Sequence, residues 1–248
     1  MSLMRQYNHV KYDLNKARPN MISWDITNKC NMKCQHCFNN SGDNNFYDFD
    51  NELTEKEIIN IAYQIAKLKP IQCCICGGEP LLCKHLFQVV NILSKSKIMT
   101  NMVTNGLLLT NEVALQLKES GISRIQISVD GLGYQHDIFR NMNGAFVKAI
   151  QAIEILVENN IDYMVSFCPN TLNYKSFSLY VSYMNKLKCN SIRMMPLLPL
   201  GRGKLNFSHL LLNSNETFEF VQNIFEVQKK YPHIQIEWGD PLEHLYLV

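Results

Sequence analysis

The sequence predicts an α/β protein, namely a partial (β/α)6 TIM-like barrel with mostly parallel strands. Apolar runs of strand length alternate with amphipathic stretches of helix length, and parallel strands need such crossover connections. The length of 248 residues suits one barrel, and a hydrophobic share of 46% is enough for a large core. Because the chain lacks the glycine fingerprint of dinucleotide-binding folds, a barrel is favoured over an open doubly wound sheet.

Each expected strand is a short apolar run that stops at glycine, proline or a polar turn. The run IQCCIC, for example, stops at Gly77 and Gly78. The six strands of the barrel are expected at residues 20–27, 71–76, 98–104, 122–129, 161–168 and 191–195. One more strand is expected after them, at residues 233–238.

Start and stop signals place the helices between these strands. Thr54 and Glu57 have the spacing of a capping box, which opens a helix that continues to about Lys67. Thr110 is expected to cap another helix, which Gly121 ends. The remaining helices are expected at residues 84–95, 144–158, 173–187 and 215–231. We therefore divide the chain into an N-terminal segment (1–19), the barrel (20–205), and a C-terminal helix and strand that could begin a longer extension (206–248).

Charge and cysteine content exclude several classes of protein. Lys and Arg total 24 and Asp and Glu total 22, a balance that argues against a nucleic-acid partner. No apolar run reaches the length of a membrane span, and the N-terminus lacks the core of a signal peptide. Nine cysteines without an export signal do not indicate a disulfide scaffold. We expect a cytoplasmic protein, bound to no membrane, whose thiols are buried or bound to metal.

Polar signals follow four of the predicted strands, at the point where each strand ends. A cysteine loop follows the first strand, and Gly77-Gly78-Glu79-Pro80 follows the second. Thr104-Asn105-Gly106 follows the third, and Ser128-Val129-Asp130-Gly131 the fourth. In a β/α barrel these ends share the C-terminal face, where active sites are built. The sequence therefore predicts one site formed by four loops.

The most specific signal is the spacing of Cys30, Cys34 and Cys37 in the first of these loops. Three thiolates in eight residues can hold zinc or an iron–sulfur cluster. Zinc would need a fourth ligand, and His36 directly precedes Cys37, so both are unsuited to one tetrahedral ion. A closed [4Fe–4S] cluster would need a fourth cysteine, for which Cys76 or Cys83 are available. We favour the third alternative, a [4Fe–4S] cluster with three cysteine ligands and one iron open to a cofactor or substrate.

These residues resemble a known family. The run CNMKCQHCF (30–38), with an aromatic ring before the third cysteine, and the run Gly77-Gly78-Glu79-Pro80 resemble the two signatures of the radical S-adenosylmethionine (radical SAM) superfamily. The resemblance covers roughly residues 20–200. It implies that Cys30, Cys34 and Cys37 bind a [4Fe–4S] cluster whose open iron binds SAM. Cleavage of SAM would then yield a 5′-deoxyadenosyl radical for hydrogen abstraction, with electrons from a flavodoxin- or ferredoxin-type donor.

The resemblance also implies a set of residues that contact SAM. Glycines at 77 and 78 would let the backbone approach the methionyl ammonium, near Glu79. Ser128 and Asp130 resemble contacts to the methionyl carboxylate and the ribose, and Arg140 would pair with the carboxylate. Thr104 and Asn105 could be only a turn, and the run after the sixth strand resembles a segment beside adenine. The full predicted set is His36, Phe38, Gly77, Gly78, Glu79, Pro80, Thr104, Asn105, Ser128, Asp130, Arg140 and Leu198.

The motifs resemble most closely the core of the SPASM-type branch, which modifies peptides and proteins. The cysteine-rich C-terminal extension of that branch is missing here, since no cysteine follows Cys189. The predicted function is radical modification of a peptide or protein side chain. One alternative is a radical SAM enzyme that acts on a small metabolite or cofactor precursor. The alternative of another class is an iron–sulfur electron carrier or sensor without enzyme activity.

The six other cysteines are expected to be mainly packing residues. Cys73, Cys74 and Cys76 lie in a predicted strand, whose alternation sends Cys74 and Cys76 to one face and Cys73 to the other. Cys83 could lie near the rim of the barrel, with a role close to the substrate as the alternative. The other two cysteines are expected to be core thiols, namely Cys168 and Cys189.

Overall fold

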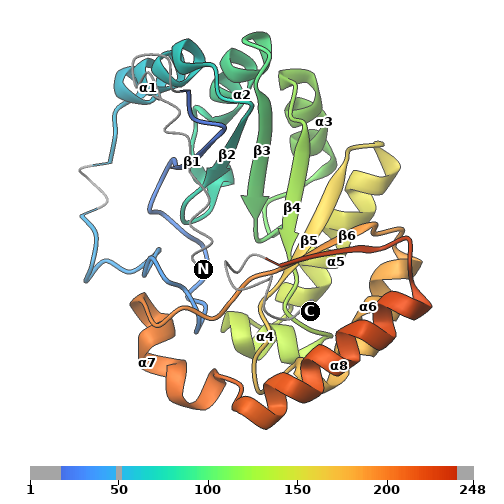
Figure 1. Ribbon diagram of the computed structural model, residues 1–248. Coiled ribbons are helices and arrows are strands. Elements are labelled where there is room, and N and C mark those ends of the chain that lie inside the picture. The colour runs from blue at the N-terminus through green and yellow to red at the C-terminus, as the bar shows by residue number, and fades with distance from the viewer. Residues whose placement is uncertain (1–17, 49–51, 239–248) are drawn as a thin grey trace, which may run out of the picture.

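The computed structural model describes residues 18–48 and 52–238. They contain one parallel seven-stranded sheet, with helices between its strands (Figure 1). The strands follow the chain order, from β1 at one edge to β7 at the other, and the sheet does not close on itself. The prediction of a partial barrel with parallel strands is therefore confirmed. The strands are β1 Met21–Asp25, β2 Gln72–Cys76, β3 Met99–Thr104, β4 Arg124–Ser128, β5 Tyr163–Phe167, β6 Ser191–Met194 and β7 Gln235–Trp238.

Helices connect the strands, and the capping signals of the sequence are present in the structure. The Thr54 side chain accepts a hydrogen bond from the Glu57 backbone, which completes the capping box of α1. Gly121 ends α3 in the left-handed conformation. The helices are α1 Glu55–Leu68, α2 Leu86–Lys95, α3 Asn111–Ser120, α4 Tyr134–Arg140, α5 Ala145–Glu158, α6 Phe177–Lys186, α7 Gly201–Leu210 and α8 Ser214–Lys230, with 3-10 turns η2 Pro80–Leu82 and η3 Tyr174–Ser176.

The sequence analysis missed two helices, α4 and α7. Among the described residues, neither helix has a side-chain hydrogen bond at its N-cap, which is Gly133 for α4 and Leu200 for α7. Both helices lie beside the carboxyl ends of the strands (Figure 1). β7 pairs with β6 and thus extends the sheet beyond the six strands predicted for the barrel. The predictions for residues 1–17 and 239–248 lie outside the described residues.

The main core lies between the sheet and the helices on its outer face. Alternate strand residues such as Cys73, Ile75 and Met102 are fully buried there, together with helix residues such as Leu86 and Leu117. In β2 and β3 the residues between them point to the inner face of the sheet and are less buried, whereas every residue of β5 is buried. Since all strands are parallel, their carboxyl ends open on one rim of that inner face.

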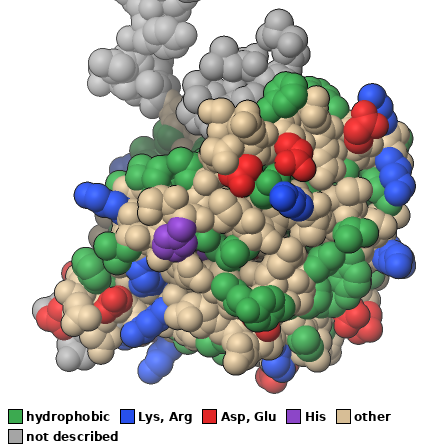
Figure 2. All heavy atoms as spheres, turned by 90° about the horizontal axis from the view of Figure 1, so that it is seen from below, with side chains coloured by type: hydrophobic (Ala, Val, Ile, Leu, Met, Phe, Trp, Pro, Cys, Tyr) green, Lys and Arg blue, Asp and Glu red, His purple; other side chains and the backbone are tan. Residues whose placement is uncertain are grey.

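The described residues include no helix long and apolar enough to cross a membrane. Seen from below, positively and negatively charged side chains are interspersed among apolar ones (Figure 2). This mixture agrees with the formal net charge of +2.

Candidate functional site

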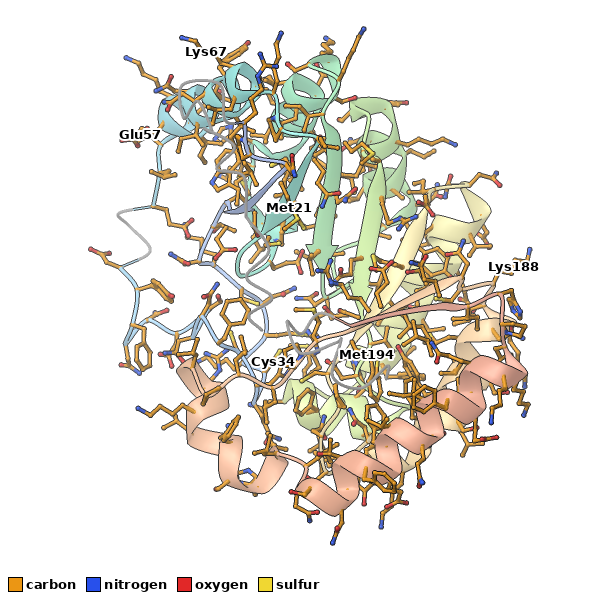
Figure 3. The ribbon with its side chains drawn as sticks, viewed as in Figure 1. Met21, Cys34, Glu57, Lys67, Lys188 and Met194 are labelled. Atoms are coloured by element: carbon orange, nitrogen blue, oxygen red, sulfur yellow. The ribbon has the colours of Figure 1, made fainter. Side chains whose placement is uncertain are left out.

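The cysteine loop follows β1 and brings its three thiols to one apolar cluster. Cys34 is buried, and Cys30 and Cys37 are half-buried against Met32 and Ala145. The pKa of Cys30 is raised to about 11, mainly by burial and in smaller part by charge repulsion from groups that include Cys34 and Cys37. Figure 3 shows Cys34 near the lower ends of the strands. The three thiols therefore share one site at the rim.

Cys76 and Cys83, the two candidates for a fourth ligand of a closed cluster, do not belong to the apolar cluster of the cysteine loop. Cys76 contacts Cys74 and Ser23 on β2 and β1, and Cys83 packs in the main core. Within the part of the chain that the structure describes, no three His, Cys, Asp or Glu side chains are arranged to hold a single metal ion. A cluster of several irons fits the donor set better, because thiolates are its usual ligands and its inorganic core fills the space between them.

The glycines after β2 support the cysteine loop directly. The Gly78 N–H donates to the Thr27 carbonyl at 2.7 Å, and the Glu79 N–H donates to the Lys29 carbonyl at 2.8 Å. A Cβ at Gly78 would lie 2.1 Å from the Lys29 oxygen, and one at Gly77 would lie 2.4 Å from the Thr27 oxygen. The close packing of the two loops therefore requires glycine at both positions, whatever these residues contact besides.

Glu79 is 0% exposed and joins the loops after β2 and β3. Its carboxylate accepts hydrogen bonds from the Thr104 hydroxyl at 2.7 Å, the Asn105 N–H at 2.9 Å and the Leu81 N–H at 3.1 Å. Burial raises its pKa, although these three donors oppose that effect. Pro80, at the start of η2, is buried beside it. Glu79 therefore acts on neighbouring protein groups and fixes their positions.

Thr104 and Asn105 form more than a simple turn. The Asn105 backbone donates to Glu79, and the Asn105 side chain donates to the Asn31 side chain, within the cysteine loop, at 2.7 Å. Three loops that follow β1, β2 and β3 are thereby connected through buried polar groups. Such a network holds its members in one arrangement when every group has its partner.

Asp130 and Arg140 form a buried ion pair next to the cysteine loop. The Arg140 Nε and Nη2 atoms lie 2.7 and 2.6 Å from the Asp130 Oδ2 atom, and the Cys168 N–H donates to Oδ1 at 2.8 Å. Burial by itself would raise the pKa of Asp130, but the Arg140 guanidinium and two nearby histidines lower it below its ordinary value. The Arg140 Nη1 atom lies 3.9 Å from the Cys34 sulfur. The two residues predicted to contact SAM separately are paired with each other here.

His36 stacks on Phe139 of α4, with ring centroids 4.1 Å apart and planes 3° apart. Its Nε2 atom lies 3.9 Å from Asp130 Oδ2, and burial lowers its pKa to about 3, so the ring is neutral. The backbone of Gln35 also donates to the Phe139 carbonyl at 3.0 Å. The helix α4 is therefore the element that brings Phe139 and Arg140 against the cysteine loop.

Arg202, at the start of α7, holds the other side of the cysteine loop. Its N–H donates to the Cys37 carbonyl and its Nε to the Cys34 carbonyl, both at 2.9 Å, while Nη2 donates to the Ser41 carbonyl at 3.1 Å. A Cβ at Gly201 would lie 2.5 Å from the Cys37 oxygen, so glycine allows this contact. Leu198 was the residue predicted from this segment, and the contacts of Arg202 were not predicted. An Arg between two glycines after the sixth strand was the available signal.

The remaining predicted residues lie at the rim with different exposure. Phe38 is 50% exposed and Leu198 is 37% exposed, so both can contact a bound molecule. Ser128 is buried at the end of β4, where it accepts a hydrogen bond from Ser166 at 3.5 Å. The structure therefore brings the predicted set together around one rim, but most of its polar members are occupied by protein partners.

A family model described as the radical SAM superfamily matches residues 24–177. The chain belongs to the radical SAM superfamily. Members of this superfamily use SAM and a [4Fe–4S] cluster, which agrees with the three thiols at the rim.

Three similar proteins show the range of the superfamily. An AdoMet-dependent heme synthase of Methanosarcina barkeri is 29% identical over 187 residues, which are 75% of this chain and 52% of that protein. The sporulation killing factor maturation protein SkfB of Bacillus subtilis is 27% identical over 240 residues, which are 97% of this chain and 55% of SkfB. The crystal structure of Streptococcus suis SuiB bound to the precursor peptide SuiA has a TM-score of 0.74 at 14% identity. That match covers 90% of this chain and 49% of SuiB, and at this identity it shows the fold alone. The chain spans about half the length of the relatives that it matches.

Proposed function

We propose that this chain is the cofactor-binding core of a radical SAM enzyme that modifies a side chain of a peptide or protein. The observation that carries the proposal is the gathering of Cys30, Cys34 and Cys37 around one apolar cluster at the rim. Membership of the superfamily and the likeness to SkfB along 97% of the chain support it.

In this proposal Cys30, Cys34 and Cys37 hold the [4Fe–4S] cluster, and SAM binds at the rim beside it. When bound, these groups supply a 5′-deoxyadenosyl radical that removes hydrogen from an unactivated C–H bond. In this proposal Phe38 and Leu198, which are both exposed, contact SAM. The buried residues Glu79, Asn105 and Asp130 keep the loops in position, and the apolar surroundings of Cys34 exclude water.

The pair of Asp130 and Arg140 holds the Arg140 guanidinium beside the Cys34 thiol. The Arg140 and Arg202 guanidinium groups both oppose the rise in the pKa of Cys34 that burial causes. They therefore favour the thiolate, the form that binds iron. Electrons would come from an external donor of the flavodoxin or ferredoxin type.

Anaerobic reconstitution with iron and sulfide, followed by dithionite and SAM, tests the enzyme proposal. We expect 5′-deoxyadenosine in amounts that exceed the protein concentration. An intact cluster without 5′-deoxyadenosine would contradict it and would favour an electron carrier or sensor.

The likeness to a heme synthase favours a second candidate, a radical SAM enzyme that acts on a small molecule. The two candidates differ in what stimulates SAM cleavage. A cysteine-containing linear peptide should raise the rate of 5′-deoxyadenosine formation if the peptide proposal is right, and a porphyrin should not. The opposite result would favour the small-molecule candidate.

A further inference from the structure

Cys74 and Cys76 form a pair of thiols on the inner face of the sheet, separate from the cysteine loop. Their sulfur atoms lie 3.4 Å apart, within the distance of an S–H···S hydrogen bond. Both residues are half-buried. Cys73, which directly precedes Cys74 in the sequence, points to the opposite face of the strand and is 0% exposed in the main core. The alternation of β2 therefore presents two of its three thiols to the inside of the partial barrel.

Polar and charged groups of other strands act on the pair. In the register of the sheet, Ser23 of β1 pairs with Cys74 and Asp25 pairs with Cys76. The Ser23 hydroxyl donates to the Cys76 sulfur at 3.7 Å. Arg193 of β6 supplies a positive charge close enough to act on Cys74. Figure 3 marks Met21, at the start of the β1 strand that flanks the pair.

The hydrogen bond makes the two thiols unequal. The hydrogen bond between the two sulfurs lowers the pKa of Cys74 and raises that of Cys76. The positive charge of Arg193 also lowers the pKa of Cys74, whereas burial and the nearby Cys73 and Asp25 oppose this effect. Cys74 is therefore the member of the pair that loses its proton more readily. A thiolate is the attacking form in exchange with a disulfide, and a second thiol nearby can resolve the mixed disulfide.

We propose that Cys74 and Cys76 form a thiol–disulfide exchange site on the inner face of the sheet, whose partner is a disulfide that includes a cysteine side chain or a small thiol. The Cys74 thiolate attacks one sulfur of the partner, a new S–S bond forms, the old S–S bond breaks, and one thiolate leaves. Cys76 loses its proton to that thiolate and attacks the Cys74 sulfur, which releases the second thiolate. Two electrons pass from the pair to the partner, which is reduced, and Cys74 and Cys76 become a disulfide.

The geometry of the strand allows this disulfide. Residues two apart on one strand have Cα atoms about 6.6 Å apart at the usual rise. That separation lies near the upper end of the range for disulfides, so the bond would be strained and easily reduced again. The site does not rest on the proposed function, because the exchange needs no cleavage of SAM.

Glutathione disulfide is the probe that tests this site. The protein is reconstituted anaerobically first, so that the cluster protects the thiols of the cysteine loop. The reaction is followed by intact mass and by mapping of modified peptides. Wild-type protein should form a disulfide between Cys74 and Cys76, without a lasting glutathione adduct.

Three variants separate the roles of the thiols. Cys76→Ser should keep glutathione bound to Cys74, and Cys74→Ser should react at least about tenfold more slowly than the wild type, because the thiolate is lost. Cys73→Ala is the matched control on the opposite face and should react like the wild type. Equal rates for Cys74→Ser and wild type, or an adduct mapped to another cysteine, would overturn the proposal.

A measurement on the wild type avoids any loss of fold in the variants. Limited iodoacetamide, added to the holoprotein, should label Cys74 before every cysteine outside the cysteine loop. Preferential labelling of Cys83, Cys168 or Cys189 would contradict the assignment of Cys74 as the reactive thiol.

Discussion

The molecule holds two groups of thiols, and they are positioned in different ways. The thiols of the cysteine loop are held by contacts from remote parts of the chain, such as Gly78 and Arg202. The thiols of β2 are placed by strand alternation alone, with Cys73 on one face and Cys74 and Cys76 on the other. The first group should therefore be sensitive to distant substitutions that leave the second group unchanged.

The largest expected effect is on the cysteine loop itself. Cys34→Ala should abolish the iron–sulfur absorbance after anaerobic reconstitution, because a proposed ligand is removed. Cys189→Ala removes a buried core thiol instead and should keep the absorbance. Iron and sulfide analysis checks both, and equal loss in the two variants would mean that the thiols of the cysteine loop are not the ligands.

The next effect comes from the buried ion pair. Asp130→Asn leaves the Arg140 charge without its carboxylate and should lower the free energy of unfolding by about 4 kcal/mol at neutral pH. The folded pKa of Asp130 is lowered, so this stabilisation is present above the unfolded pKa of about 3.9 and is lost as the pH falls through the folded value.

Thermal unfolding at a series of pH values measures this effect. The difference between wild type and Asp130→Asn should be largest near neutral pH and should shrink in acid. A difference that does not change between neutral pH and pH values below about 3 would show that the carboxylate charge is not the cause. Labelling of Cys74 in the native state should be the same in both proteins, since β2 does not depend on this pair.

The contrast between local and remote support also explains what could be predicted from the sequence. The capping box at Thr54 and the alternation of β2 depend on residues close in the chain, and the structure confirms both. The helices α4 and α7 have no side-chain hydrogen bond at their N-caps, and both are hydrogen-bonded to the cysteine loop, through Phe139 and Arg202. Arg202 contacts Cys34, which is 168 residues away in the sequence, so a local pattern could not show its partner.

The spacing of the cysteines indicated the thiols of the site, but not which polar residues support them. Glu79, Asp130 and Arg140 were predicted to contact SAM, and the structure adds protein partners for all three that no motif indicates. A motif shows that a residue type is needed at a position. The partner becomes visible only when loops from several strands meet at the rim.

A smaller effect is expected for Arg202, which donates to the carbonyls of Cys34 and Ser41. Arg202→Gln should lose both bonds and destabilise the fold by about 2 kcal/mol, the usual range for hydrogen bonds from a charged group. The iron content after reconstitution should fall as well, and Arg202→Lys should restore it only in part. Arg124→Gln, which removes an exposed pair with Asp162, is the matched control and should change neither quantity by much. Full iron content in Arg202→Gln would show that α7 is not needed to hold the loop.

The smallest effect distinguishes the two faces of β2. Cys73 packs in the main core, so Cys73→Ala should lower the free energy of unfolding by about 1 kcal/mol through the small cavity that it leaves. Cys74 is half-buried on the inner face, and Cys74→Ala should change stability by less than about 0.5 kcal/mol. Denaturant unfolding of both variants measures the difference. If Cys74→Ala proved the more destabilising variant, the Cys74 thiol would contribute to packing. The distinction between Cys73 as a packing residue and Cys74 as a reactive thiol would then be wrong.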